Sequence, residues 1–323
     1  LRDFCNEYGI PYDMCGKLIV ATDDSEIPQL EELFKRGTEN GAEGLRMVDQ
    51  EEIKEIEPYS AGVKAILSPN TGIIDYFEVS QAYATRMREN GGDLLTNVEV
   101  ISIENKDGLV YLETTSGTVV AKYVLNCAGL HADTVARMMG VDVGVKIVPF
   151  RGEYFSIIPE KEHMVKGLIY PVPNPSMPFL GVHFTRRING SVEAGPNAVF
   201  AFAREGYKKT DVNLKDTLGT LSYSGFWKMS AKYWKVGMHE QYRSLVRGVF
   251  VKSLQKLMPE ITGDDLGDPG AGVRAQVIDS NGGLLQDFAI EASANAIHVL
   301  SAPSPGATSS LTISEYIVDL AQE

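Results

Sequence analysis

An arginine in a glycine-containing segment is the first candidate for chemistry in this sequence. Arg274 lies in Ala271-Gly-Val-Arg-Ala-Gln276, after a predicted Gly-containing turn and beside a β-rich stretch. A guanidinium presents a planar fork of N–H donors that binds a carboxylate through two parallel hydrogen bonds. Arg274 is therefore a candidate carboxylate clamp. The alternative is a solvated or ion-paired surface arginine, and the local sequence leaves both open.

A histidine on a predicted strand is the second candidate. His183 lies in Gly181-Val-His-Phe-Thr-Arg186, and Arg151 lies in Pro149-Phe-Arg-Gly-Glu-Tyr154. Both segments read as antiparallel strands. An imidazole titrates near neutral pH, so His183 could be a catalytic base or could hydrogen-bond a substrate. A structural histidine on a strand is the alternative.

Two stretches of small residues would let backbone approach a ligand closely. An apolar strand at 123–126 runs into Cys127-Ala-Gly129, and Ser301-Ala-Pro-Ser-Pro-Gly-Ala-Thr-Ser309 opens the last predicted helix. The first resembles a strand-to-helix ligand turn. A helix N-terminus has free N–H groups and partial positive charge, which suit an electron-rich ring edge. A tight turn and an ordinary capped loop are the alternatives.

Several other chemistries lack their signatures. No GxGxxG opens a βαβ unit, and neither GxxxxGK[ST] nor GxSxG occurs, so the usual phosphate loops and serine-hydrolase chemistry are not predicted. The five histidines have no ligand spacing, and the three cysteines form no CxxC motif. No metal site is therefore predicted.

The elements that must position these residues read as an α/β chain. Asp75 and Glu78 predict a capped helix that ends near Gly91. Strands are expected at 98–103, 109–115 and 118–121, an antiparallel sheet over 145–200, and helices over 211–258. The strand, glycine turn and helix at 123–139 indicate a doubly wound, Rossmann-like sheet. The predicted domains are discontinuous: a nucleotide-binding domain at 68–143 and 271–323, and an antiparallel α+β substrate domain at 1–67 and 144–270.

The charge is strongly acidic overall but locally basic. A net charge of -13 argues against nucleic acid as a partner. Residues 204–256 nevertheless carry 11 Lys/Arg against 4 Asp/Glu, together with Trp227, Tyr233 and Trp234. This composition suits an anionic membrane surface; a solvated helical face or an oligomer contact is the alternative. No apolar run is long enough to span a membrane and no signal peptide is visible. The expected location is cytoplasmic, free or peripheral at the inner face of the membrane.

Taken in order, these segments resemble the D-amino-acid-oxidase superfamily of FAD enzymes, and within it the L-2-hydroxyglutarate dehydrogenases/oxidases. The resemblance covers the chain from about Phe4. It rests on six blocks: Pro149-Phe-Arg-Gly-Glu-Tyr-Phe155, Leu168-Ile-Tyr-Pro-Val-Pro173, Pro178-Phe-Leu-Gly-Val-His183, Gly195-Pro-Asn-Ala198, Ala271-Gly-Val-Arg-Ala-Gln276 and Ala302-Pro-Ser-Pro-Gly-Ala-Thr308. Family members begin with a strand and a GxGxxG turn, so the resemblance implies an FAD domain truncated at its N-terminus.

The resemblance also implies roles for individual residues. Arg274 matches the arginine that pairs with the substrate carboxylate, and His183 is placed like a substrate-side histidine. Arg151 and Tyr170 would line the same pocket. The residues expected to contact FAD are Val98 through its backbone, the turn Ala128 and Gly129, and the loop Ser304, Pro305, Gly306, Ala307 and Thr308.

The reaction implied is oxidation of L-2-hydroxyglutarate to 2-oxoglutarate with FAD as cofactor, and the basic region 204–256 would suit electron delivery to a membrane quinone. One alternative keeps the superfamily and changes the substrate to an amino acid or glycerol 3-phosphate. The other is a non-catalytic fragment that does not bind FAD.

Overall fold

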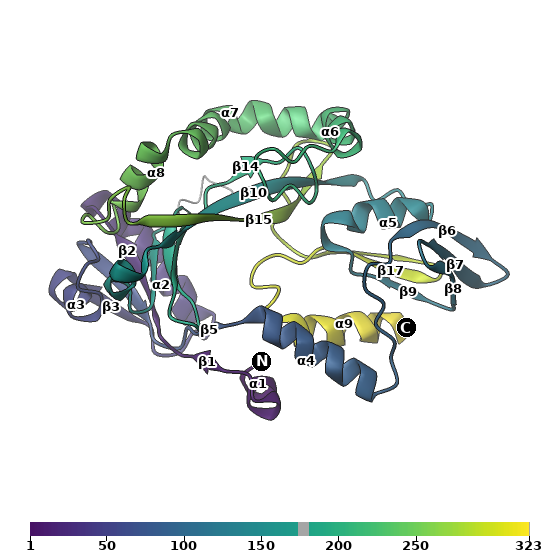
Figure 1. Ribbon diagram of the computed structural model, residues 1–323, viewed down its shortest axis with the longest axis horizontal. Helices are drawn as coiled ribbons and strands as arrows, with labels where there is room; N and C mark the ends of the chain where they lie inside the picture. Colours follow the sequence, from purple (N-terminus) through teal and green to yellow (C-terminus); the bar gives the residue numbers. More distant parts are fainter. Residues whose placement is uncertain (174–180, 323) are drawn as a thin grey trace.

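The computed structural model describes residues 1–173 and 181–322, which form a mixed α/β fold around one large sheet (Figure 1). Nine strands build this sheet in the order β14-β10-β13-β12-β11-β2-β4-β3, and β15 pairs with β10 on the opposite side from β13 and β14. The strands are β2 (Lys17–Ala21), β3 (Arg46–Asp49), β4 (Lys64–Ser68), β10 (Val145–Ile157), β11 (Leu168–Pro171), β12 (His183–Arg186), β13 (Val192–Gly195), β14 (Val199–Phe200) and β15 (Leu266–Asp279).

One face of the central strands carries the main core. Leu18, Ile169 and Phe184 are almost fully buried on one face, where they pack with Phe250 and Leu254. The residues that alternate with them point to the other face, where α2 covers one end of the sheet through Leu30, which packs with Ile66 of β4 and Ile19 of β2. The helices that accompany this sheet are α2 (Ile27–Glu39), α3 (Gln50–Ile56), α6 (Leu214–Leu221), α7 (Ser224–Leu245) and α8 (Arg247–Leu254).

A smaller three-stranded sheet has helices on both faces. Its order is β16-β17-β9, and β17 runs parallel to β9. Residues of β17 alternate between two helices, since Leu300 packs with α5 whereas Ile297 and Val299 pack with α9. The predicted doubly wound character is therefore confirmed here. The elements are β9 (Val124–Asn126), β16 (Ala289–Ser293), β17 (Ala296–Ser301), α5 (Ala132–Met138) and α9 (Ser310–Gln322).

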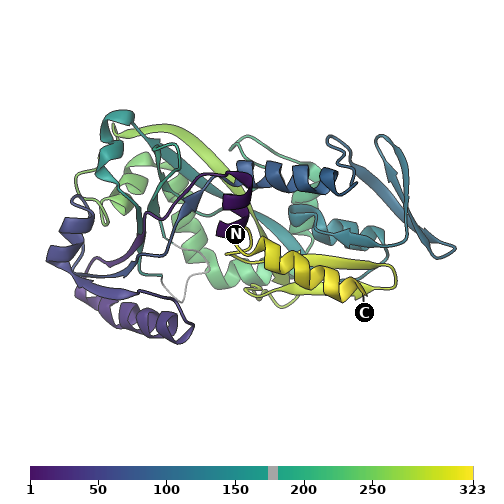
Figure 2. The same cartoon turned by 90° about the horizontal axis from the view of Figure 1, so that it is seen from below.

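Helix α4 (Tyr76–Glu89) begins where the sequence predicts, because the Asp75 side chain accepts a hydrogen bond from the Phe77 N–H. It overlaps α9 in Figure 1 but is separated from it in the view of Figure 2, and the two helices meet where the Tyr83 and Ser310 hydroxyls are 3.0 Å apart. The N-terminal helix packs on it through Phe4 and Cys5. The remaining elements are α1 (Arg2–Tyr8), β1 (Tyr12–Asp13), β5 (Ile73–Ile74), β6 (Val100–Lys106), β7 (Leu109–Thr114) and β8 (Gly117–Ala121).

A buried ion pair joins the two sheets. Asp133 on α5 has no exposed surface, and its Oδ1 lies 2.6 Å from Nη1 of Arg204, in the connection between β14 and α6. Arg137 also reaches Asp133 at 3.0 Å. Loss of one partner would leave an uncompensated buried charge, which costs about 3–5 kcal/mol. The network therefore fixes the position of α5 relative to the large sheet.

The structure corrects several predicted elements. The Gly-containing turn before Arg274 is wrong, since β15 is continuous through Gly270 and Gly272. The antiparallel sheet predicted over 145–200 is confirmed by the pairings among β10 to β14, and β2 joins this sheet through a parallel pair with β11. The strand expected at 98–103 begins at Val100. The predicted domain bounds stay a prediction; residue 271 lies within β15, which pairs with β10. Residues 178–180 of the block Pro178 to His183 lie outside the described residues.

Candidate active site

His183 and Tyr170 form a stacked pair on neighbouring strands. Phe184 points into the core, so alternation directs His183 to the other face of the sheet, beside Tyr170 on β11. The two rings stack with centroids 4.0 Å apart. The His183 Nδ1 lies 3.0 Å from the Gly181 carbonyl oxygen. Because a carbonyl only accepts, Nδ1 carries the hydrogen, and in the neutral ring Nε2 is left as the proton acceptor.

Burial keeps this imidazole neutral. His183 is 7% exposed, and loss of hydration is the main cause that lowers its pKa from 6.5 to about 4. The hydrogen bond with Gly181 raises the pKa, while the charges of Arg274 and Lys17 lower it further. At pH 7 His183 is therefore an uncharged base with a fixed tautomer.

Arg274 lies on the same face as His183, two strands beyond β13. On the long β10–β15 ribbon, Arg274 is opposite Phe150 and Gly270 is opposite Tyr154. The pairing of β10 with β13 and β13 with β12 extends that row to His183. The charge of Arg274 lowers the pKa of His183 and opposes the desolvation that raises the pKa of Tyr170. The structure thus brings Arg274, His183 and Tyr170 into electrostatic contact.

Glycines leave open space on this face next to Arg274. A Cβ added at Gly270 or Gly272 would meet no atom within 4 Å. By contrast, a Cβ at Gly152 would lie 2.9 Å from the Pro196 side chain, and Gly195 also has close neighbours. The β15 glycines are therefore not required by packing within the chain. They leave a bare strip of strand on which a flat ligand can lie.

Arg151 is not part of this group. Its position on β10 is one residue from Phe150, so its side chain projects to the opposite face. There its Nη2 and Nε donate to Oε1 of Glu153 at 3.0 and 3.2 Å, and Nη1 donates to the Lys208 carbonyl at 3.2 Å. Its guanidinium is occupied in a buried structural network, which separates it from the predicted pocket residues.

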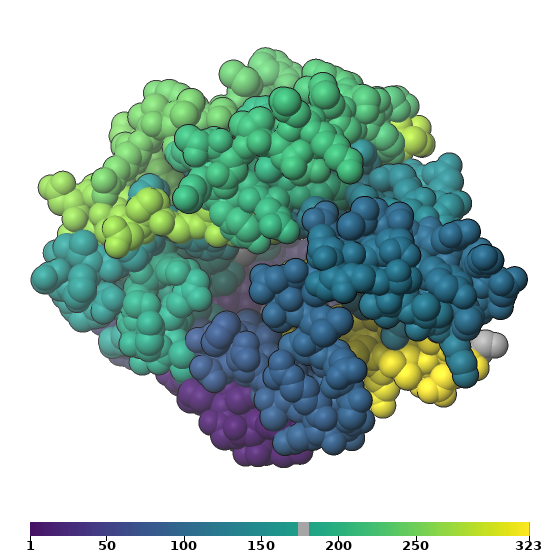
Figure 3. Space-filling model, turned by 45° about the vertical axis from the view of Figure 1, so that its right-hand side comes forward, coloured from purple at the N-terminus to yellow at the C-terminus, as the bar shows by residue number. Residues whose placement is uncertain are grey.

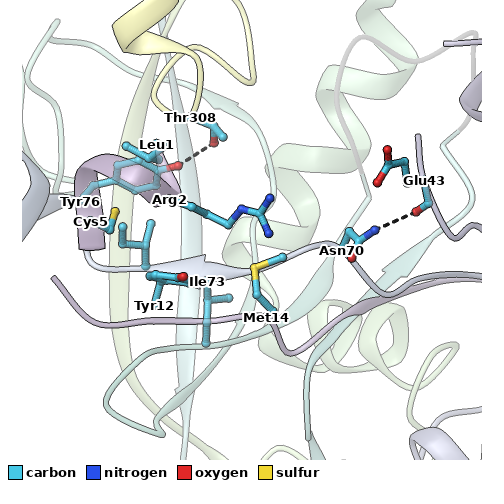
Figure 4. Close-up of a pocket in the computed structure, with 12 residues that line it drawn as sticks. Leu1, Arg2, Cys5, Tyr12, Met14, Glu43, Asn70, Ile73, Tyr76 and Thr308 are labelled. Atoms are coloured by element: carbon cyan, nitrogen blue, oxygen red, sulfur yellow. Dashed lines mark hydrogen bonds between the residues drawn. The ribbon is translucent and has the colours of Figure 1, made fainter. Parts of the chain in front are cut away.

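The small-residue loop before α9 lies between two cavities. Ser304, Pro305 and Gly306 line a cavity of about 620 Å³ together with Tyr316. Thr308 lines another, of about 500 Å³, and its hydroxyl is 2.6 Å from that of Tyr76 (Figure 4). Arg2 extends into this second cavity. Both cavities are large enough for part of a dinucleotide cofactor.

The other predicted FAD contacts lie next to two three-stranded sheets, β16-β17-β9 and β6-β7-β8. Ala128 and Gly129 follow β9 and are exposed, and Gly129 has a φ of 53°, which favours glycine. A ligand could approach their backbone directly. Val98 is half-buried just before β6. These residues and Ala307 keep their roles as predictions.

Lys17 is a member of the site that the sequence did not reveal. Its Nζ lies 5.4 Å from the centroid of the Tyr170 ring, and its charge acts on His183. The available signal was the alternation in Lys17-Leu-Ile-Val-Ala21, which places Lys17 opposite to the core residues Leu18 and Val20. Only the parallel pairing of β2 with β11 brings it next to Tyr170.

The chain matches one family model and is similar in sequence to several known proteins. Residues 1–320 match the family model described as FAD dependent oxidoreductase. L-2-hydroxyglutarate dehydrogenase of Indibacter alkaliphilus is 50% identical, over 96% of this chain and 78% of that protein. The mitochondrial L-2-hydroxyglutarate dehydrogenase of Homo sapiens is 44% identical, over 100% of this chain and 73% of that protein. The Escherichia coli L-2-hydroxyglutarate dehydrogenase is 42% identical, over 99% and 76%.

Solved structures share the fold at low identity. L-alpha-glycerophosphate oxidase from Mycoplasma pneumoniae, with FAD bound, superimposes with a TM-score of 0.76 at 22% identity, covering 97% of this chain and 74% of that one. Glycine oxidase from Geobacillus kaustophilus gives a TM-score of 0.69 at 16% identity, covering 99% and 75%.

Proposed function

The chain belongs to the family of FAD-dependent oxidoreductases, and from that premise we propose that it oxidises L-2-hydroxyglutarate to 2-oxoglutarate. The observation that carries the proposal is the shared face of Arg274, His183 and Tyr170: a carboxylate-binding fork within electrostatic reach of a neutral imidazole. A 2-hydroxy acid needs both groups, one for its carboxylate and one for its hydroxyl proton. The names of relatives at 42–50% identity supply the substrate.

The residues present fit FAD. The open strip at Gly270 and Gly272 accepts a flat ring, because no atom of the chain occupies the space that side chains there would fill. The loop 304–308 adds two adjoining cavities and the start of α9. We propose that Ser304 to Thr308 hold the cofactor near its ring, and that Ala128, Gly129 and Val98 lie along its nucleotide end. When bound, FAD supplies a two-electron acceptor for the hydrogen that leaves C2.

The protein's own residues bind and orient the acid and remove one proton. Arg274 receives the C1 carboxylate through its planar fork. His183 accepts the C2 hydroxyl proton at Nε2, which the Gly181 carbonyl leaves free by holding the hydrogen on Nδ1. Tyr170 supports the imidazole plane by stacking. Once the proton has left the hydroxyl oxygen and the C2 hydrogen has left with its electron pair, the product is a 2-oxo acid.

A substrate panel tests this assignment. Under anaerobic conditions the substrate reduces the FAD-loaded protein, and the loss of flavin absorbance measures the rate. This rate should be highest with L-2-hydroxyglutarate. D-2-hydroxyglutarate, L-glutamate and sn-glycerol 3-phosphate should each react at least about tenfold more slowly, because each misplaces or lacks a group that the site binds. Faster reduction by glutamate or glycerol 3-phosphate would select the alternative substrates. A purified chain that takes up no FAD would favour the non-catalytic fragment.

We further propose that the helical region 204–256 contacts an anionic membrane surface, where a quinone would take up the electrons that the substrate gives to FAD. After the kink at Tyr233, exposed apolar side chains recur on one stripe of α7 at Trp234, Met238, Tyr242 and Leu245. Three lysines of the same helix, Lys228, Lys232 and Lys235, add positive charge. This region forms the upper part of the surface seen in Figure 3. Such a combination is typical of helices that lie in a membrane interface.

An apolar cavity beneath the stripe supports the proposal that a quinone binds here. It measures about 320 Å³ and is lined by Phe200, Phe226, Tyr233, Trp234 and also Phe150, the cross-strand neighbour of Arg274. No helix in the described part of the chain is both long and apolar enough to cross a bilayer.

Vesicle binding tests the membrane contact. The double variant Trp234→Ser/Met238→Ser should bind vesicles containing phosphatidylglycerol at least about tenfold more weakly than the parent, because two apolar anchors are lost. The matched control, Val119→Ser/Val120→Ser on the exposed strand β8, should bind like the parent. Binding that is indifferent to anionic lipid, to salt and to the α7 substitutions would exclude the membrane contact.

A further inference from the structure

A second cation shares the face that carries Arg274 and His183. On β2, Leu18 and Val20 are 1% and 0% exposed in the core, so the alternating residues Lys17 and Ile19 project to the other face. Parallel pairing sets Ile19 opposite Tyr170. In the strand order β2-β11-β12-β13-β10-β15, Lys17 therefore lies at one end of the site and Arg274 at the other, with His183 between them.

The two cations act on the same imidazole. The Lys17 Nζ is 5.4 Å from the Tyr170 ring centroid, and the Tyr170 ring stacks on His183 at 4.0 Å. Both Lys17 and Arg274 contribute to the low pKa of His183, so both charges lie within electrostatic reach of it. Arg274 thus lies on the β13 side of His183 and Lys17 on the β11 side, with β11 and its Tyr170 between Lys17 and His183.

The Lys17 ammonium is held in a place that lacks a counter-charge within the described chain. Burial lowers its pKa below the usual 10.5, because the ammonium loses hydration. Across residues 1–173 and 181–322 the ion pairs involve other side chains, and Lys17 contacts the aromatic ring of Tyr170. A partly desolvated cation is costly without an anionic partner. A ligand carboxylate at this position would offset that cost.

We infer that Lys17 binds the second carboxylate of the substrate, the one farther from the reacting carbon, and thereby selects dicarboxylic over monocarboxylic 2-hydroxy acids. The inference rests on the proposed function and names the residue that recognises the far end of the substrate. A 2-hydroxy diacid carries negative charge at both ends and its reacting hydroxyl near one of them. The site offers the complementary order: a guanidinium, an imidazole base, and an ammonium.

Ligand binding by matched variants tests the inference without relying on turnover. Calorimetry would give the Kd of 2-oxoglutarate and of 2-oxopentanoate, which has the same carbon chain but lacks the far carboxylate. In the FAD-loaded protein, Lys17→Met should weaken 2-oxoglutarate binding roughly 10- to 100-fold, because one charge-assisted contact is lost. Binding of 2-oxopentanoate should change less than about twofold, and Lys17→Arg should keep most of the preference. Lys35→Met, on exposed α2, is the control.

The outcomes separate this inference from the proposed function. Equal weakening of both ligands by Lys17→Met would mean a structural role and overturn the inference, as would an unchanged preference. If Lys17→Met does not fold, the Lys17→Arg and Lys17→Gln pair decides: loss of the dicarboxylate preference in Gln alone supports the inference, and its retention in Gln overturns it. L-2-hydroxyglutarate could reduce the wild-type protein while the protein binds 2-oxoglutarate and 2-oxopentanoate equally. That result would overturn the inference and leave the proposed function intact. L-2-hydroxyglutarate could instead fail to reduce the flavin while 2-oxoglutarate binds tightly in a way that depends on Lys17. That result would contradict the proposed function and leave the inference intact.

Discussion

Replacing Arg274 with alanine is expected to lower kcat/KM for L-2-hydroxyglutarate by roughly 30- to 4000-fold. Truncating one member of a desolvated charge pair costs about 2–5 kcal/mol, and each 1.4 kcal/mol is about tenfold. The loss should fall on substrate binding and on the chemical step together, because the clamp also sets the position of C2 relative to His183. Stopped-flow reduction of the bound flavin at several substrate concentrations measures both.

Two further variants make this result specific. Arg274→Lys keeps the charge but loses the planar fork, so it should fall between the parent and Arg274→Ala. Arg46→Ala removes a half-exposed arginine that pairs with Glu52 at the far edge of the sheet, and should leave kcat/KM unchanged. An Arg274→Ala protein with normal FAD content and a loss below about threefold would refute the clamp.

The second large effect is expected at His183. His183→Ala should slow flavin reduction at saturating substrate by roughly 100- to 10,000-fold, the usual contribution of a positioned base, with a smaller change in substrate Kd. The pH dependence carries a further signature. Because the pKa of His183 lies at about 4, the imidazole is already neutral at pH 6, and the rate should fall only as pH drops through that pKa and the ring becomes protonated.

Glutamine at position 183 tests whether His183 acts by accepting a proton or only by its polar, planar shape. His183→Gln keeps a polar, planar side chain but cannot accept the proton, so it should lose both the rate and the acid limb of the profile. The control is His163→Ala, since His163 contacts Tyr59 away from this face. An unchanged rate of flavin reduction in either His183 variant would remove His183 from the mechanism and point to another base.

Local signals predicted the elements of the fold better than their pairing. The Asp75 cap and the alternation of the central strands depend on neighbouring residues, and the sequence carries both. The parallel pair of β2 and β11 joins segments about 150 residues apart, which no local pattern encodes. The sequence did not predict Lys17 as a site residue, because a lysine at the start of a strand usually faces solvent.

Arg151 shows the limit of a motif within a strand. The block Pro149 to Phe155 marks the right part of the chain, but successive side chains point to opposite faces. Tyr154 therefore shares the face of His183, whereas Arg151 is paired with Glu153 on the other. The alternation was visible in the sequence; which face would carry the site was decided by strand order, through β13 and β12.

The central proposal is that Arg274, His183 and the loop 304–308 border one cleft. A crystal structure of the FAD-loaded protein with 2-oxoglutarate measures this directly. We expect the C1 carboxylate on the Arg274 guanidinium, the C2 oxygen facing His183 Nε2, and the flavin ring between the ligand and residues 304–308. A ligand held away from Arg274, or a flavin on the far side of the sheet from His183, would contradict the account.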